Sequence, residues 1–310
     1  MPGIHHVTGI AGNPARNLEF YTRTLGLRLV KRTVNFDDPG TYHFYFGDER
    51  GSPGSILTFF PWEHAAPGRD GTGVARTVAF RVPEGAISAW VQRLAQRGVK
   101  HAAPGLCFGQ PVLEFADPDG MHLALIGIAG AEREPVWSGG GIPADQAIRG
   151  LEGVTLVLEA ASQTAAVLTG LLGFQEEARE GDRVRYRAHG GNGGVVTIRE
   201  AVDLPAARMG RGSVHHVAFC ARDDREQADM SRKLVSDYHL HPTGQKDRQY
   251  FRSIYFREPG GVLFEIATLE PGFAIDEPAA DLGKTLKLPP FLEPRRGYLE
   301  SVLPRLEPMP

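Results

Sequence analysis

The sequence predicts an α+β fold in which four βαβββ modules pair into two half-barrel domains. The first observation is a repeat, because a β-branched strand, an amphipathic helix and further strands recur roughly every 50 to 75 residues. The second is the placement of glycine and proline: glycines follow three of the four helical segments, and Gly- and Pro-rich turns separate the strands. The third is the length of 310 residues, which suits two domains of about 150 residues each.

The first module spans about residues 4–62. It opens with a short extended segment at 6–10, after which Asn13 and Pro14 suit the cap and the first turn of a helix. Apolar residues then recur at i, i+3 and i+7, which is typical of one face of an amphipathic helix. Three strands are expected to complete the module, at 27–36, 42–46 and 56–60.

The other three modules repeat this order at about residues 75–128, 151–200 and 213–270. Their opening strands are expected at 77–82, 154–158 and 216–219, and their helices at 87–97, 162–172 and 225–238. Later strands follow in each module, at 112–115 and 122–126, at 183–187 and 195–199, and at 252–256 and 262–267.

The repeat predicts the domain organisation. Residues 1–132 are expected to form an N-terminal domain and residues 151–270 a C-terminal domain, joined by a Gly-rich linker at 133–150. Residues 271–310 are rich in proline, so they are expected to form an extended tail that wraps over a surface. One short helix is expected in this tail, at 298–303.

Composition excludes several classes of protein. Hydrophobic residues make up 42% and charged residues 23%, which is typical of a globular chain. The 34 basic and 37 acidic residues give a net charge of −3, so nothing indicates a nucleic-acid partner. No apolar run reaches the length of about 18 residues that a membrane helix needs, and the N-terminus lacks a targeting pattern. These features predict a soluble, cytoplasmic protein with no membrane partner.

Some residues carry no functional prediction. The two cysteines, Cys107 and Cys220, are expected to be small buried hydrophobes. The dipeptides Lys31-Arg32 and Arg295-Arg296 are expected on the solvated surface. A further group of aromatic residues suits either the wall of a substrate pocket or plain core: Phe44, Phe46, Phe59 and Trp62.

The last strands of the modules differ at one aligned position. Four residues after the turn glycine, the modules carry Thr58, Ala124, Ile198 and Glu265. Glu265 lies in an otherwise apolar strand, and a buried carboxylate is costly unless it is paired or bound to a metal. From the residues alone, Glu265 could equally face solvent or meet an arginine.

The opening strands differ in the same way. The first and fourth modules begin with His5-His6 and His215-His216, whereas the second and third carry Arg76-Thr77 and Glu152-Gly153. Two histidines and one carboxylate make a facial triad that suits Fe(II) and leaves positions open for substrate and O₂. Adjacent residues of a strand point to opposite faces, so a regular strand can present only one histidine of each pair.

These residues give the chain a family resemblance. It resembles the vicinal oxygen chelate superfamily (glyoxalase, bleomycin resistance and dioxygenase proteins), and within it the ring-cleaving hydroquinone dioxygenases. In the N-terminal half the resemblance rests on Ile4-His5-His6-Val7-Thr8, Phe20-Tyr21 with Gly26, Val30-Lys31-Arg32-Thr33-Val34, Tyr42-His43-Phe44-Tyr45-Phe46, Gly51-Ser52-Pro53-Gly54 and Phe108-Gly109-Gln110. It continues in His215-His216-Val217-Ala218-Phe219, Asp247-Arg248, Tyr250-Phe251, Pro259-Gly260-Gly261-Val262-Leu263-Phe264-Glu265, Leu282-Gly283 and Leu286-Lys287-Leu288-Pro289-Pro290.

The resemblance implies a glyoxalase-like pairing of modules and a set of site residues. Its metal ligands fall on His6, His216 and Glu265, and its catalytic polar residues on His5, Thr8, His215, Arg248 and Tyr255. The implied metal is Fe(II), with Mn(II) possible. Because the ligands come from the first and fourth modules, these two are expected to face each other, and the second and third to pair separately.

The resemblance implies a dioxygenase that opens a hydroquinone-class aromatic ring with O₂. From the residues alone, Arg248 would be a solvated loop charge, and Tyr255 could be a packed strand aromatic. Three alternatives share the fold: an extradiol dioxygenase acting on catechols, a glyoxalase-like lyase or isomerase, and a metal-free binding protein. The lyase would need a second carboxylate where Thr58 stands, and the binding protein would not need the three ligands. A homo-oligomer is expected only from general frequency.

Overall fold

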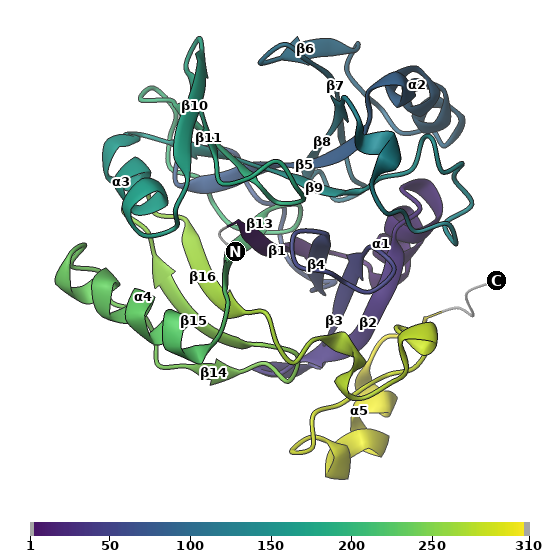
Figure 1. Ribbon diagram of the computed structural model, residues 1–310. Helices are drawn as coiled ribbons and strands as arrows, with labels where there is room; N and C mark the ends of the chain where they lie inside the picture. Colours follow the sequence, from purple (N-terminus) through teal and green to yellow (C-terminus); the bar gives the residue numbers. More distant parts are fainter. Residues whose placement is uncertain (1–2, 307–310) are drawn as a thin grey trace.

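Two eight-stranded sheets form the body of the protein (Figure 1). The structure is a computed structural model that describes residues 3–306, so the last four residues of the predicted tail lie outside the described chain. The strand order of the first sheet is β14-β15-β16-β13-β1-β4-β3-β2, and that of the second is β10-β11-β12-β9-β5-β8-β7-β6. The predicted α+β class with paired half-barrel modules is confirmed.

The first sheet is made by the first and fourth modules. Its strands are β1 (Ile4–Ala11), β2 (Arg28–Asn35), β3 (Asp38–Gly47), β4 (Ile56–Pro61), β13 (Val214–Ala221), β14 (Lys246–Asp247), β15 (Arg252–Arg257) and β16 (Leu263–Thr268). β1 pairs antiparallel with β13 and so joins the two modules edge to edge. The expectation that these two modules face each other is confirmed.

The second sheet is made by the second and third modules, joined by β5 and β9. Its strands are β5 (Val74–Pro83), β6 (Gly105–Cys107), β7 (Gln110–Ala116), β8 (His122–Ile128), β9 (Gly150–Leu158), β10 (Gln175–Glu180), β11 (Arg183–Arg187) and β12 (Val195–Glu200). Each sheet therefore draws on both halves of the chain, and the segment 133–150 lies between modules without separating the two sheets.

One helix of each module packs beside its sheet. The helices are α1 (Pro14–Glu19, continued by a π-helical turn at Phe20–Thr24), α2 (Ile87–Gln96), α3 (Ser162–Gly170) and α4 (Asp224–Ser236). Asn13 caps α1 as predicted, since its side chain accepts a hydrogen bond from the Arg16 amide. The short edge strands β6, β10 and β14 were not expected from the sequence, because they are short or polar and pair on only one side.

β-bulges interrupt both central strand pairs at equivalent places. Between β1 and β13, the registers Ile4↔Phe219 to His6↔Ala218 and Thr8↔His216 to Gly9↔Val214 leave His5 and His215 as extra residues. Between β5 and β9, the same two shifts leave Arg76 and Glu152 as the extra residues. The sequence alignment of the four opening strands therefore holds residue for residue. A bulge re-aims a side chain that a regular strand would point away.

The C-terminal tail packs beside β2 and contains more turns than expected. The short helix α5 (Arg296–Val302) lies close to the predicted 298–303, and 3₁₀ turns precede it at 273–275, 279–281 and 293–295. Leu286 bridges to Arg32. A small apolar cluster holds the end of the tail against Val34 of β2, through Leu288, Leu292, Leu299 and Leu303.

Two expectations about exposure were wrong. Lys31 is fully buried rather than solvated, because the tail folds over it and supplies two carboxylates. Its Nζ lies 2.6 Å from Oδ1 of Asp276, and it also pairs with Glu277. The cysteines Cys107 and Cys220 are half-buried rather than buried. No helix within residues 3–306 combines the length and the apolar character needed to cross a membrane.

Lys31→Ala should destabilise the fold by about 3–5 kcal/mol, because it leaves the tail carboxylates of Asp276 and Glu277 without their buried cation. Urea unfolding at neutral pH measures this change. The matched control is Lys284→Ala, which removes an exposed pair with Asp281 and should cost at most about 1 kcal/mol. Equal losses in the two variants would contradict the role given to Lys31.

Candidate metal centre

Three side chains that can bind a metal converge where the first and fourth modules meet. His6 lies on β1, His216 on β13 and Glu265 on β16, and their ligand atoms all lie within 4.8 Å of one another. The Nε2 atoms of His6 and His216 lie 3.4 and 2.9 Å from Oε2 of Glu265. All three side chains are buried. The group therefore depends on the pairing of β1 with β13.

The bulges bring both histidines of each pair to this group. Nδ1 of His5 lies 2.9 Å from Nδ1 of His6, and Nδ1 of His215 lies 2.8 Å from Nδ1 of His216. A histidine that binds a metal through Nε2 carries its proton on Nδ1, so His6 and His216 are the donors. Burial lowers the pKa of His5 and of His215 to about 3, so both are neutral acceptors. With a metal bound, each pair would therefore present an unprotonated Nε2 to it.

Glu265 has one satisfied oxygen and one open oxygen. Oε1 accepts a hydrogen bond from the Ser253 hydroxyl on the neighbouring strand β15. Oε2 is buried and accepts no well-aligned hydrogen bond from the described residues, although both Nε2 atoms lie close to it. Burial disfavours the charged form, but with no metal bound the electrostatic attraction of His6 and His216 outweighs burial and holds the pKa of Glu265 well below its usual range. An ionised oxygen in this position needs a cation.

The donor set fits a divalent first-row metal ion. Two neutral imidazoles and one carboxylate form the facial triad found in non-haem Fe(II) oxygenases. The unsatisfied Oε2 of Glu265 is the observation that points to a cation at this place. The same three residues line a cleft, so the remaining coordination positions face an open space.

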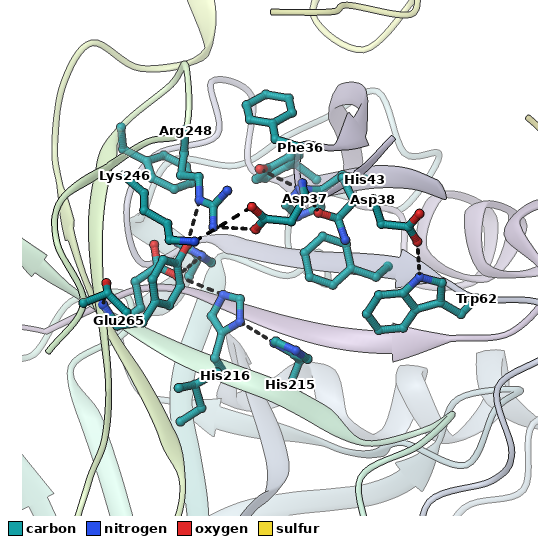
Figure 2. A pocket seen from close by; sticks show the side chains of 18 residues that line it. Phe36, Asp37, Asp38, His43, Trp62, His215, His216, Lys246, Arg248 and Glu265 are labelled. Carbon is teal, nitrogen blue, oxygen red and sulfur yellow. Dashed lines mark hydrogen bonds and ion pairs between the residues drawn. The ribbon is translucent and has the colours of Figure 1, made fainter. Parts of the chain in front are cut away.

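The cleft in front of the three ligands has a volume of about 440 Å³, which is within the usual range for a small-molecule site. In Figure 2, Arg248 and Lys246 reach in from one side and Asp37, Asp38 and Trp62 from the other. Besides its histidines, six aromatic side chains line the cleft: Phe36, Tyr45, Phe60, Trp62, Phe251 and Tyr255.

Arg248 and Tyr255 act as one unit within this cleft. Nε of Arg248 donates to the Tyr255 hydroxyl oxygen at 3.0 Å. Burial, and then the negative charge of Glu265, raises the pKa of Tyr255, so this hydroxyl stays protonated. Because the oxygen already accepts from Arg248, the hydroxyl can act toward a ligand in the cleft only as a donor.

Comparison with known proteins places this site in a family. Residues 3–125 match the sequence model of the Glyoxalase/Bleomycin resistance protein/Dioxygenase superfamily. The chain is 45% identical over 306 residues to "Putative ring-cleaving dioxygenase MhqO" of Bacillus subtilis, covering 97% of this chain and 95% of the relative. The chain belongs to the ring-cleaving dioxygenase family of this superfamily.

Two further matches cover nearly the whole dioxygenase. One is the "Chlorohydroquinone/hydroquinone 1,2-dioxygenase" of Sphingobium indicum, 33% identical over 301 residues, which cover 94% of this chain and 93% of the relative. The other is a crystal structure of a "putative dioxygenase" from Bacillus subtilis, with a TM-score of 0.94 at 44% identity, covering 98% and 97% of the two chains. The predicted family resemblance is therefore confirmed.

The predicted catalytic residues of the dioxygenase fall into two layers. His215, Arg248 and Tyr255 line the cleft itself. His5 and Thr8 lie behind it: His5 is buried against His6, and the Thr8 hydroxyl lies 2.8 Å from that of Thr58. The first three can contact a ligand in the cleft. His5 supports His6, and Thr8 supports Thr58, which in turn contacts His43.

Sequence reasoning missed His43, which also lines the cleft. Its Nε2 lies 2.9 Å from the Thr58 hydroxyl and its Nδ1 lies 2.9 Å from the Tyr45 hydroxyl. The sequence does carry a signal for His43. Residues two apart in a strand share a face, so His43 and Tyr45 of β3 point to the same side. His43 and Tyr45 both line the cleft. Of the four aromatic residues that suited either a pocket wall or core, Trp62 lines the cleft, and the other three lie in the core: Phe44, Phe46 and Phe59.

The aligned position in the third module was wrong by one residue. The ladders pair Ala218 with Glu265 and the equivalent Thr155 with Thr197, so Thr197 rather than Ile198 corresponds to Glu265. A slip of one residue moves a side chain to the opposite face, and Ile198 indeed lies in the core. The corresponding residue of the second module is Ala124. The second sheet thus has the same bulged geometry but neither histidine nor glutamate at the equivalent positions, which are Thr77, Gly153, Ala124 and Thr197.

Ser253→Ala should weaken metal binding about 10- to 100-fold, because it removes the donor that orients Oε1 of Glu265. Anaerobic titration of the metal-free protein with Fe(II) in competition with a chelator measures the change. Ser55→Ala is the matched control, since it removes a buried serine whose hydroxyl donates to the Ser52 carbonyl and accepts from the Asp48 amide, rather than bonding to Glu265. A loss of affinity in both variants, or in neither, would refute this role for Ser253.

Proposed function

We propose that this dioxygenase opens the ring of a hydroquinone-class substrate with O₂, using Fe(II), or alternatively Mn(II), held by His6, His216 and Glu265. The observation that carries the proposal is the three-ligand group with an unsatisfied carboxylate oxygen, set at the base of an aromatic-walled cleft. The relative from Sphingobium indicum that is named a chlorohydroquinone/hydroquinone 1,2-dioxygenase supports the substrate class.

The metal in such a facial triad supplies adjacent open positions where a phenolic oxygen and O₂ are brought together. The chain's own part is to keep the three ligands unprotonated and fixed. His5 and His215 do this through the Nδ1 contacts to His6 and His216. Ser253 does it for Glu265 by donating to Oε1.

Arg248 and Tyr255 would bind and polarise the substrate. The Tyr255 hydroxyl, which accepts from Nε of Arg248, would donate its proton to a substrate oxygen. The guanidinium places a fixed positive charge at the cleft, where negative charge develops on a phenolic oxygen. The role proposed for this pair is to orient the ring and stabilise that charge.

Two neutral imidazoles line the cleft, and both are already engaged: Nδ1 of His215 contacts His216, and both ring nitrogens of His43 contact hydroxyls. His215 lies next to the metal ligand His216, and His43 lies across the cleft on β3. Burial lowers the pKa of His43 well below its usual value, so the ring is neutral and would hold the hydroxyls of Thr58 and Tyr45 in place rather than act as a base. Thr8 supports His43 through the hydroxyl of Thr58, which contacts both.

The position equivalent to Glu265 in the first module distinguishes ring cleavage from the lyase alternative. Thr58 occupies this position, and its hydroxyl is committed to Thr8 and His43. A lyase or isomerase that needs a second carboxylate has none there. Oxygen uptake with methylhydroquinone compared with catechol decides which of the two ring types is the substrate. The cytoplasmic location and a homo-oligomeric state stay predictions.

Anaerobically Fe(II)-loaded protein should take up O₂ when methylhydroquinone is added and should respond weakly to catechol. His216→Ala and Glu265→Ala should each lower the rate by at least about 100-fold, since loss of a ligand exceeds the cost of losing its support. An oxygen electrode measures the rates, and bound metal is measured in parallel.

The matched control for this assay is His122→Ala, which removes a histidine of the second sheet that pairs with Asp70 and should leave the rate unchanged. Uptake with catechol alone would move the substrate to ortho-diols. Absence of uptake with both substrates in metal-loaded protein would refute the dioxygenase proposal and favour a lyase or isomerase.

A further inference from the structure

An ion-pair cluster closes one side of the cleft. Nη2 of Arg248 donates to Oδ2 of Asp37 at 2.8 Å, and Nζ of Lys246 lies 3.9 Å from Oδ1 of the same carboxylate. These three residues, which we call the ionic clasp, line the cleft beside the metal ligands (Figure 2). The clasp includes a residue of the proposed substrate site, since Arg248 also donates to Tyr255.

The clasp joins the two free edges of the first sheet. Asp37 lies in the turn between β2 and β3, and Lys246 begins β14. β2 and β14 are the terminal strands of the sheet order, so the two ends of the curled sheet meet at this point. Figure 1 shows β14 beside the β2–β3 hairpin at the bottom of the view. The contact spans 211 residues of sequence.

The turn that carries Asp37 is held in place from both sides. The Asn35 side chain accepts a hydrogen bond from the Asp37 amide, and Asn35 is buried. On the far side, Oδ2 of Asp38 accepts from the Trp62 indole and from the Thr41 hydroxyl. The backbone position of Asp37 is thus fixed by its neighbours, and its own side chain is free to serve Arg248.

The side chain of Arg248 needs such a partner because its hydrogen bonds go to residues outside its own loop. Arg248 lies in a tight turn in which Gln249 has a positive φ of 68°, and its side chain projects across the cleft. Its polar partners on the described chain are the Tyr255 hydroxyl and Asp37. The side chain of Arg248 is only 16% exposed, whereas that of Asp37 is 60% exposed, so solvent can reach the clasp from the Asp37 side.

We propose that Asp37 is a positioning residue of the dioxygenase: it orients Arg248 over the substrate site and closes the cleft between the two edges of the sheet. This inference rests on the proposed function, because Arg248 must act on a substrate for its orientation to matter. A guanidinium bound at both Nε and Nη2 keeps one geometry, and misplacement by about 1 Å can cost about 100-fold in rate.

Asp37→Ala should lower kcat/KM for methylhydroquinone about 10- to 100-fold with an unchanged metal content, because Arg248 loses its anchor. Asp37→Glu should restore part of the loss, since it keeps the carboxylate. In the background of Arg248→Ala, the second change Asp37→Ala should alter kcat/KM by less than about twofold, because Asp37 acts through Arg248. Steady-state oxygen uptake gives all these values.

A second measurement needs no substrate. Hydrogen exchange of the segments 35–40 and 245–251 should be about fivefold faster in Asp37→Ala than in the parent, since the clasp that joins them is open. The control for both experiments is Asp182→Asn, which breaks an exposed pair with Arg199 in the second sheet and should change neither value.

The possible outcomes separate the two proposals. If the parent protein consumes no O₂ with methylhydroquinone, the proposed function fails, and the hydrogen-exchange result still decides whether the clasp exists. If the parent is active and Asp37→Ala matches it in kcat/KM, Asp37 does not position Arg248. Additive losses in the double variant would also overturn the inference, since they would mean that Asp37 acts independently of Arg248.

Discussion

The antiparallel pairing of β1 with β13 is the contact on which the site depends. It joins the first and last modules, so it brings His6 within reach of His216 and of Glu265 on the next strand. The two bulges in this pairing are as important as the pairing itself. They place His5 and His215 against the Nδ1 atoms of the ligands, so that each ligand histidine is oriented by its own neighbour in the chain.

The second sheet shows what the same geometry does without the ligands. It carries bulges at Arg76 and Glu152, the counterparts of the two outer histidines. Glu152 is buried and pairs with Arg81 instead of orienting a ligand. One architecture therefore carries a candidate metal site in one sheet and a network of ion pairs in the other, and the difference lies in a few side chains at equivalent positions.

Sequence reasoning reached the repeat, the ordering of helices and strands and the grouping of His6, His216 and Glu265, because each left a local or periodic signal. It did not reach the burial of Lys31, whose partners Asp276 and Glu277 come from a tail about 245 residues away. It also missed Asp37, since a turn carboxylate gains meaning only when the opposite sheet edge brings Arg248 to it. The misplacement of Ile198 for Thr197 arose because counting from a turn glycine ignores small differences in hairpin length.

The pairing of the first module with the fourth, and of the second with the third, determines which sheet can be completed first during synthesis. All strands of the second sheet lie between residues 74 and 200, so a chain leaving the ribosome completes that sheet before β13 has been made. Until then β1 has a partner on one side only, in β4, and its other edge stays open to strands of other chains. The first sheet can therefore be completed only after all strands of the second have been synthesised, and the three candidate ligands can come together only once β13 and β16 have left the ribosome.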